Sequence, residues 1–143
     1  YVEELGLEDH VRFVDLVPEP QVLYGVADVL LAPSRGETMP FTVMEALCSG
    51  TPVVASDLAG HRFLGDALDS CAIAPRQPQP FAAAARRFLE MSAEERARLC
   101  GVARDWIVER LDVRVAAQRL LADYESCLGR GGVALDAIAS GSR

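Results

Sequence analysis

Residues 29–56, VLLAPSRGETMPFTVMEALCSGTPVVAS, contain the pattern that decides the fold. The apolar run Val29–Ala32 is typical of a buried parallel strand, because both faces of such a strand are covered. Pro33 to Gly36 then turn the chain, and Pro40 suits the first turn of a helix, where its missing N–H would have no helical partner anyway. The stretch therefore predicts a strand, a turn and a helix in succession.

The rest of the first half repeats this alternation. The helix is expected to end near Cys48, with Gly50 in the left-handed conformation that caps helices. Further strands are predicted at Val11–Val17, Pro52–Ala55 and Cys71–Ala74, with helical stretches between them. Strands that alternate with helices indicate an α/β fold, here a Rossmann-like parallel sheet with flanking helices.

The second half is expected to be helical. Helices are predicted from Pro80 onward, from a capping box that starts at Ser92, and from about Asp112. We therefore expect one domain over residues 1–128, whereas residues 129–143, rich in Gly, Ala and Ser, are typical of a flexible tail. The last helix carries an apolar stripe of Val113, Ala117, Leu120, Leu121, Tyr124 and Leu128.

Two glutamates lie eight positions apart, Glu37 in the predicted loop and Glu45 in the predicted helix. A desolvated carboxylate in an apolar helix is costly unless something pairs with it, so we expect Glu45 to bind a ligand; pairing with a local cation is the alternative. For Glu37, an exposed loop position is a nearly equal alternative. The free N–H groups of Phe41, Thr42 and Val43 at the helix start predict an anion site. Together these features predict a site for a polyhydroxylated, negatively charged ligand.

This segment resembles the E-x7-E motif of retaining glycosyltransferases of family 4, whose fold is the two-domain GT-B architecture. The spacing alone is a weak signal, and the ordered flanking matches make it strong. The resemblance runs from Tyr1 to Leu128 and implies the C-terminal, donor-binding half of such an enzyme. The flanking matches are Val11–Val14, Leu16–Pro18, Leu23–Asp28 and Gly50–Ser56.

The resemblance also implies roles for single residues. Glu45 would bind the ribose hydroxyls of the nucleotide sugar, and Glu37 would reach the transferred sugar near the reaction centre. The nucleobase would lie beside Val17, Pro18 and Glu19. The diphosphate would lie beside Met39, Pro40, Phe41 and Thr42.

The chain departs from the family pattern in two places. Many members have Phe-Gly where Met39-Pro40 stands, and Pro40 has no N–H to donate to a diphosphate. A glycine often stands at the position of Asp15, whose carboxylate would repel a diphosphate. We therefore expect the diphosphate to depend on neighbouring amides and Asp15 to point elsewhere or to be paired.

The implied function is transfer of a glycosyl group, with retention, from a nucleotide-diphosphate sugar to an acceptor bound by an N-terminal domain. Family members carry that domain, and an arginine and a lysine that clamp the diphosphate, upstream of Tyr1. We therefore expect a piece of a longer protein, inactive alone. The alternatives are a non-catalytic nucleotide-sugar-binding module and a sugar-nucleotide epimerase of GT-B fold. No G-x-G-x-x-G follows the first strand, which excludes a typical dinucleotide-binding dehydrogenase.

Composition and motifs limit the classes of partner that we expect this chain to bind. The net charge of −7 over 143 residues argues against nucleic acid binding, and the 14 basic residues, all arginines, form no basic patch with interleaved aromatic residues. No Asp-x-Asp motif is present, so we expect neither a metal nor another cofactor beside the donor substrate. The sequence contains no apolar run of about 18 residues, the length that would predict a membrane span. Four cysteines without a C-x-x-C pair indicate buried free thiols in a cytoplasmic protein. A peripheral position at the inner face of the membrane stays an alternative for the longer protein.

Two further side chains have competing interpretations. His61 is expected to be a solvated loop residue rather than a general base, because no carboxylate is placed to orient it. Arg35 lies beside Glu37 in the sequence, where a surface ion pair and a phosphate contact are both compatible with the pattern.

Overall fold

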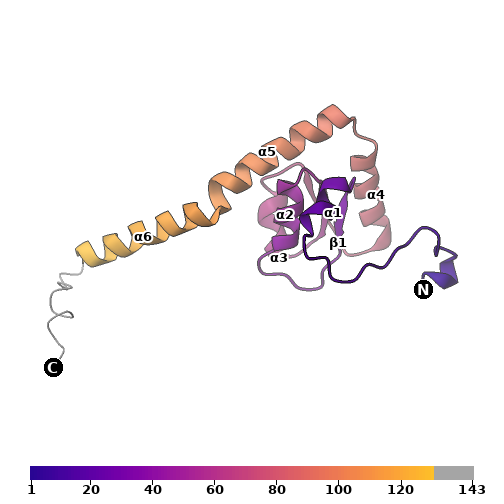
Figure 1. The fold of residues 1–143 in the computed structure, drawn as a ribbon, viewed down its shortest axis with the longest axis horizontal. Coiled ribbons are helices and arrows are strands. Elements are labelled where there is room, and N and C mark those ends of the chain that lie inside the picture. Colours follow the sequence, from indigo (N-terminus) through magenta and orange to yellow (C-terminus); the bar gives the residue numbers. More distant parts are fainter. Residues whose placement is uncertain (131–143) are drawn as a thin grey trace, which may run out of the picture.

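The computed structural model describes residues 1–130 of the chain. Three parallel strands, β1 (Leu30–Ala32), β2 (Val53–Ser56) and β3 (Cys71–Ala74), form one sheet in the order β1-β2-β3. In this register Val53 lies beside Leu30 on one side and Cys71 on the other. The α/β prediction is therefore confirmed: the fold is a Rossmann-like parallel sheet with flanking helices and a helical C-terminal part (Figure 1).

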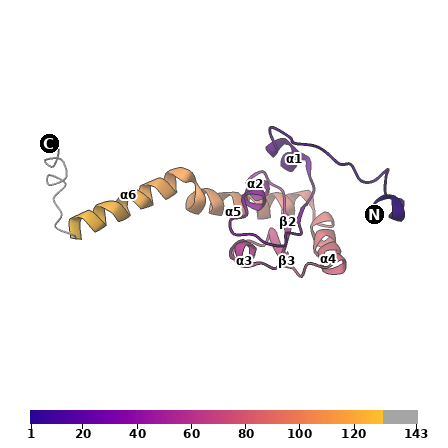
Figure 2. The same ribbon diagram turned by 90° about the horizontal axis from the view of Figure 1, so that it is seen from below.

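Helices cover both faces of the sheet (Figure 2). Alternate residues of β2 face opposite sides, so Val53 and Ala55 pack with α2, α3 and α5, while Val54 packs with Phe81 and Phe88 of α4. All four residues of β2 are buried, which makes it the central strand of the described sheet. The flanking helices are α2 (Phe41–Cys48), α3 (Ala59–Gly65), α4 (Pro78–Leu89) and α5 (Ala93–Leu111).

Helix α2 has well-defined ends. At its start, Pro40 is fully buried and its carbonyl oxygen accepts a hydrogen bond from the Met44 N–H at 3.0 Å. At its end, Gly50 has a φ of 89°, and its N–H donates to the Leu47 carbonyl. The next amide, that of Thr51, donates to the Ala46 carbonyl at 2.9 Å. This is a Schellman motif, and it confirms Gly50 as the helix cap.

The strand predicted at Val11–Val17 is wrong. A single 3-10 turn, η1 (Glu3–Leu5), precedes this stretch, which is extended but pairs with no strand among residues 1–130. Most of its apolar side chains are therefore open to solvent, and Phe13 is 83% exposed. A strand is stable only beside a partner that supplies hydrogen bonds, and no strand of the described residues pairs with this stretch.

The remaining helices lie at the rim. Helix α1 (Gln21–Val26) leads into β1, and α6 (Val113–Arg130) continues from α5 and leads away from the sheet (Figures 1 and 2). The predicted Ser92 cap of α5 is confirmed, because the Ser92 hydroxyl accepts from the Glu95 N–H at 3.1 Å. Of the predicted tail, only Gly129 and Arg130 are described, as the end of α6; the rest lies outside the described residues.

The cysteines are free, and their burial differs from the prediction at one position. Cys71 and Cys100 are buried and Cys48 is half-buried, but Cys127 is exposed on α6, which packs against no core. Burial raises the pKa of the Cys71 thiol to about 12, so it stays protonated at neutral pH. Among residues 1–130, no helix is both long and apolar enough to cross a membrane.

Candidate functional site

The carboxyl ends of β1 and β2 meet at one edge of the sheet. Residues 33–40 connect β1 to α2, and Asp57 and Leu58 connect β2 to α3. Two helices therefore begin at the edge where open α/β sheets bind their ligands. This edge is the candidate site.

The start of α2 offers backbone donors to this edge. The Phe41 N–H already donates to the Met39 carbonyl at 2.9 Å, so this amide is occupied. Among residues 1–130, the Thr42 and Val43 amides have no hydrogen-bond partner, as expected for the first turn of a helix. Met39 and Phe41 have exposed side chains, whereas Pro40 is buried beneath them. The donors that remain for an anion are thus Thr42 and Val43 rather than Phe41.

Glu37 lies in the loop between β1 and α2, half-buried. Its Oε1 accepts a hydrogen bond from the N–H of Thr38 at 3.0 Å. The described residues contain no ion pair between Glu37 and Arg35, although both lie in this loop. The Glu37 carboxylate thus has only a local partner.

Glu45 is exposed, so the expectation of a desolvated position is wrong. The core-facing side of α2 is taken by Val43, Met44, Ala46 and Leu47. Glu45 therefore lies on the opposite side, where the Tyr24 hydroxyl of α1 donates to its Oε2 at 3.3 Å. The partner of Glu45 in the unliganded chain is a phenol and not a cation.

Tyr24 connects α1 to both ends of α2. Its pKa is raised by burial first and then by the Glu45 carboxylate, while a hydrogen bond with Thr42 opposes the rise. Its carbonyl oxygen accepts a hydrogen bond from the hydroxyl of Thr51, just after the cap of α2. Sequence reasoning missed Tyr24. It lies in the segment Leu23–Asp28, where the pattern indicated a family likeness but no chemistry.

The turn expected beside a nucleobase lies at the start of α1. Val17 is half-buried, and Pro18 and Glu19 are exposed. The Glu19 carbonyl accepts a hydrogen bond from the Val22 N–H, which begins α1. No hydrogen bond within residues 1–130 joins this turn to the loop at 33–40.

The sequence also did not indicate that the start of α3 lies against the candidate site. His61 was expected in a solvated loop, but it is fully buried within α3, with Nδ1 2.8 Å from the Ser56 carbonyl oxygen. The Ser56 hydroxyl in turn donates to the Ser34 carbonyl at 2.8 Å. The expectation failed because the turn after β2 is short, and α3 begins at Ala59 and carries the ring inward.

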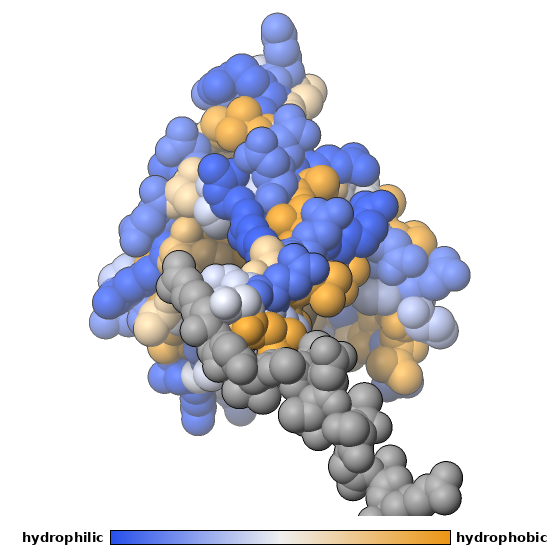
Figure 3. Space-filling model, turned by 90° about the vertical axis from the view of Figure 1, so that its left-hand side faces the viewer, coloured by the Kyte–Doolittle hydropathy of each residue, from blue (hydrophilic) through white to orange (hydrophobic). Residues whose placement is uncertain are grey.

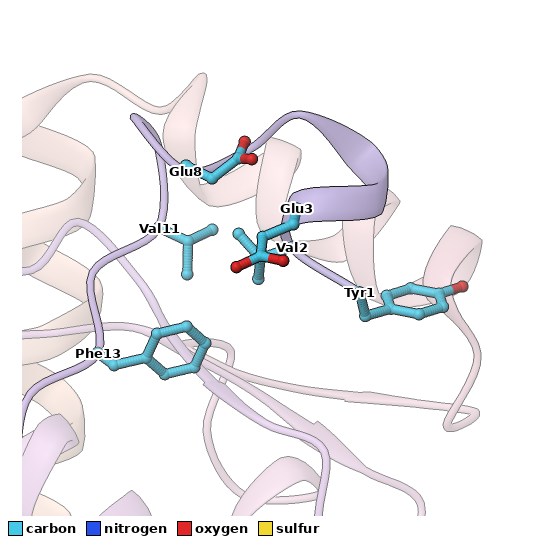
Figure 4. A pocket seen from close by; sticks show the side chains of 6 residues that line it. All are labelled: Tyr1, Val2, Glu3, Glu8, Val11 and Phe13. Atoms are coloured by element: carbon cyan, nitrogen blue, oxygen red, sulfur yellow. The ribbon is translucent and has the colours of Figure 1, made fainter.

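Hollows in the surface do not mark a better site. One of about 500 Å³ lies on the N-terminal segment (Figure 4). Glu3 and Glu8 line it and no cationic side chain does, which disfavours an anion there. Another, of about 400 Å³, lies between β1 and α4; Leu31 and Phe81 make it largely apolar, and Arg76 also lines it. Residues 1–130 contain no group of three or more His, Cys, Asp or Glu side chains that could hold a metal ion.

Comparison with known proteins identifies the relatives of this chain. The family described as "Glycosyl transferases group 1" matches residues 1–91. The 2-deoxystreptamine glucosyltransferase of Streptomyces kanamyceticus is 33% identical over 132 residues, which are 90% of this chain and 34% of that protein. The D-inositol 3-phosphate glycosyltransferase of Segniliparus rotundus is 30% identical over 135 residues, 92% of this chain and 30% of that protein.

Solved structures have the same fold. Sucrose-phosphate synthase from Thermosynechococcus elongatus matches with a TM-score of 0.77 and 27% identity, over 91% of this chain and 33% of that one. Anabaena HepE, solved in complex with UDP and glucose, matches with a TM-score of 0.77 and 23% identity, over 87% of this chain and 34% of that one. The chain thus spans about a third of the length of these proteins. It belongs to the glycosyl transferases of group 1.

Proposed function

We propose that this chain is the donor-binding part of a retaining glycosyltransferase of family 4, in which Glu37 and Glu45 are the E-x7-E glutamates. The observation that carries the proposal is that the two carboxylates flank the start of α2, at the carboxyl edge of the sheet. The relatives support it, because the two compared by sequence are named a glucosyltransferase and a glycosyltransferase, and HepE was solved with UDP and glucose. They do not favour a sugar-nucleotide epimerase.

The donor would lie along α2. The amides of Thr42 and Val43 would bind the diphosphate, with Met39, Pro40 and Phe41 around it. The carboxylate of Glu45, oriented by Tyr24, would accept hydrogen bonds from the ribose hydroxyls. The base would lie beside Val17, Pro18 and Glu19.

Glu37 is the proposed catalytic residue. When the bond between the anomeric carbon and the diphosphate breaks, negative charge grows on the leaving group and positive charge grows on the sugar. Amides at a helix start stabilise the negative charge on the leaving group. The Glu37 carboxylate, in the loop before the start of α2, would stabilise the positive charge on the sugar. No metal or other cofactor is required in this scheme.

The acceptor would be bound by an N-terminal domain of the same protein, and residues 1–128 would form part of the donor domain. The exposed stripe of α6 supports a packing partner, since Leu120, Leu121 and Tyr124 are each more than half exposed. We place the protein in the cytoplasm. For the longer protein, a peripheral position at the inner face of the membrane is the alternative. The second candidate function is a nucleotide-sugar-binding module without transfer.

Calorimetric titration of the chain with UDP, GDP and ADP tests donor binding. We expect one of them to bind and Glu45→Ala to weaken it about tenfold or more, since hydrogen bonds to charged groups contribute about 1.5–3 kcal/mol. Glu125→Ala, which removes an exposed carboxylate on α6, is the matched control and should bind normally. Binding that is absent, or the same in Glu45→Ala, would reject the site.

Transfer separates the two candidate functions. Glu37→Gln in the protein that contains this chain should keep nucleotide affinity but lose glycosyl transfer. If the unaltered protein binds the donor and neither transfers nor hydrolyses it, the binding-module hypothesis is correct.

A further inference from the structure

We propose that Ser56, Gly60 and His61 form a positioning unit that fixes the loop carrying Glu37. The inference rests on the proposed function only in assigning that loop to the transferred sugar. None of the three residues is expected to touch the donor, so they are positioning residues and not catalytic ones.

The first part of the unit is a direct backbone contact. A Cβ added at Gly60 would lie 2.4 Å from the carbonyl oxygen of Glu37 and 2.8 Å from its carbonyl carbon, distances below 3.0 Å that real Cβ atoms essentially never show. Its φ lies outside the left-handed range, so glycine is required here for close approach and not for backbone conformation. The start of α3 therefore backs directly onto the Glu37 peptide.

The second part is the anchor beneath this contact. His61 follows Gly60 in the chain, is fully buried, and has Nδ1 2.8 Å from the Ser56 carbonyl oxygen. A carbonyl only accepts, so Nδ1 carries the hydrogen and donates. Nε2 has no hydrogen-bond partner among the described residues, so the polar attachment of the ring rests on Nδ1 alone.

The third part joins the two strand ends. The Ser56 hydroxyl donates to the Ser34 carbonyl at 2.8 Å, so one residue at the end of β2 holds both the chain after β1 and the ring of α3. The loop of Glu37 is thus fixed at two points, at Ser34 by Ser56 and at Glu37 itself by Gly60. The Glu37 side chain has only the local Thr38 amide as a partner, so its place depends on this backbone support.

The unit acts on Glu37 and leaves the rest of the site alone. Glu45 and the free amides lie on α2, whose start is held by the buried Pro40 and whose end is held by the Gly50 cap. Loss of the unit should therefore weaken contacts to the sugar while contacts to the nucleotide persist. A general loss of folding would weaken both.

Four variants of the chain test this. Gly60→Ala inserts the clashing Cβ; His61→Leu removes the donor; His61→Asn keeps a donor at the Nδ1 position. Gly101→Ala is the matched control, because a Cβ there meets nothing within 4 Å. Two readouts are used: the amide NMR signals of Glu37 and Thr38 in the unliganded chain, and the ratio of affinities for UDP-glucose and UDP.

We expect Gly60→Ala and His61→Leu to move the Glu37 and Thr38 signals and to lower the affinity ratio at least threefold, with UDP affinity unchanged. His61→Asn should restore both readouts, and Gly101→Ala should alter neither. Ser56→Ala, which keeps the carbonyl and loses only the hydroxyl, replaces Gly60→Ala if that variant does not fold.

Unmoved signals in Gly60→Ala and His61→Leu would overturn the positioning unit. Equal behaviour of His61→Leu and His61→Asn would overturn the role of Nδ1. If none of UDP, GDP and ADP binds the unaltered chain but the signals move as expected, the proposed function fails and the positioning of the loop stands.

Discussion

One phenol orients the Glu45 carboxylate. Tyr24 donates to Oε2 at 3.3 Å, and no cation competes for this oxygen among the ion pairs of the described residues. We predict that Tyr24→Phe lowers nucleotide affinity about threefold to tenfold, since a typical hydrogen bond contributes about 0.5–1.5 kcal/mol. Calorimetry measures the change, and Tyr124→Phe on the exposed face of α6 is the control. An unchanged affinity in Tyr24→Phe would mean that Glu45 needs no orienting group.

The same pair predicts a pH dependence. The pKa of Tyr24 is raised above 10.0 by burial and by Glu45, so the folded state favours the protonated phenol. This contribution to stability is complete below about pH 10 and is lost as the pH rises through the raised pKa. Absorbance titration of the phenols should therefore show one late transition, which Tyr24→Phe removes and Glu45→Gln moves to lower pH. A late transition that is insensitive to Glu45→Gln would contradict this.

Single residues were predictable where local chemistry decided them. The cap at Gly50 and the Ser92 hydrogen bond follow from residue type and spacing alone. The burial of His61 and the exposure of Glu45 do not, because both depend on which side of a helix faces the sheet. In α2 the apolar residues on both sides of Glu45 hid the fact that its own side faces α1.

At the scale of elements, two glycines in similar surroundings should respond oppositely to alanine. Gly50 ends α2 with a φ of 89°, where an alanine is strained by about 1–2 kcal/mol. Gly101 lies inside α5 with open space around it, where an alanine should stabilise by about 0.5–1 kcal/mol. Thermal melts followed by circular dichroism should therefore shift in opposite directions by several degrees. Equal shifts would show that neither helix limits unfolding.

The same scale shows where sequence patterns suffice. Cys71–Ala74 was predicted to the residue, and β1 and β2 to within one residue, because each is apolar and partners another strand. The pattern of Val11–Val17 is equally apolar but forms no strand, since a strand exists only with a neighbour that supplies hydrogen bonds. Periodicity reports which residues favour a strand, and it contains no information on whether a partner is present.

At the scale of the whole molecule, α6 is an appendage. Residues 116–129 are all exposed, and α6 leads away from the sheet (Figure 1). Viewed from the end where α6 projects, apolar side chains stand in patches among hydrophilic ones (Figure 3). A chain that ends at Asp112 should therefore keep its nucleotide affinity and melt within about 4 °C of the full chain, since the lost burial is small. Circular dichroism and calorimetry measure both; a drop of more than about 10 °C would show that α6 supports the core.

The arrangement of the strands and helices was predictable only in outline. Alternating strands and helices indicated the sheet, and helical spacing indicated the apolar stripe of the last helix but not that the stripe would be exposed. The positions of helices α1 and α3 against the site were not predictable, because hydrogen bonds between distant residues set them. Tyr24 to Glu45 and Ser56 to Ser34 are such bonds, each more than twenty residues apart in the chain.

The outer edge of β1 has a consequence for solubility. Within residues 1–130 this strand pairs only with β2, and an unpaired edge can template the addition of strands from other molecules. Here the edge is three residues long and is followed by Pro33, which has no N–H to extend a ladder. An incoming strand would gain very few hydrogen bonds, while the net charge of −7 repels a second copy. Short length, a proline and like charge together make this edge a poor seed for fibrils.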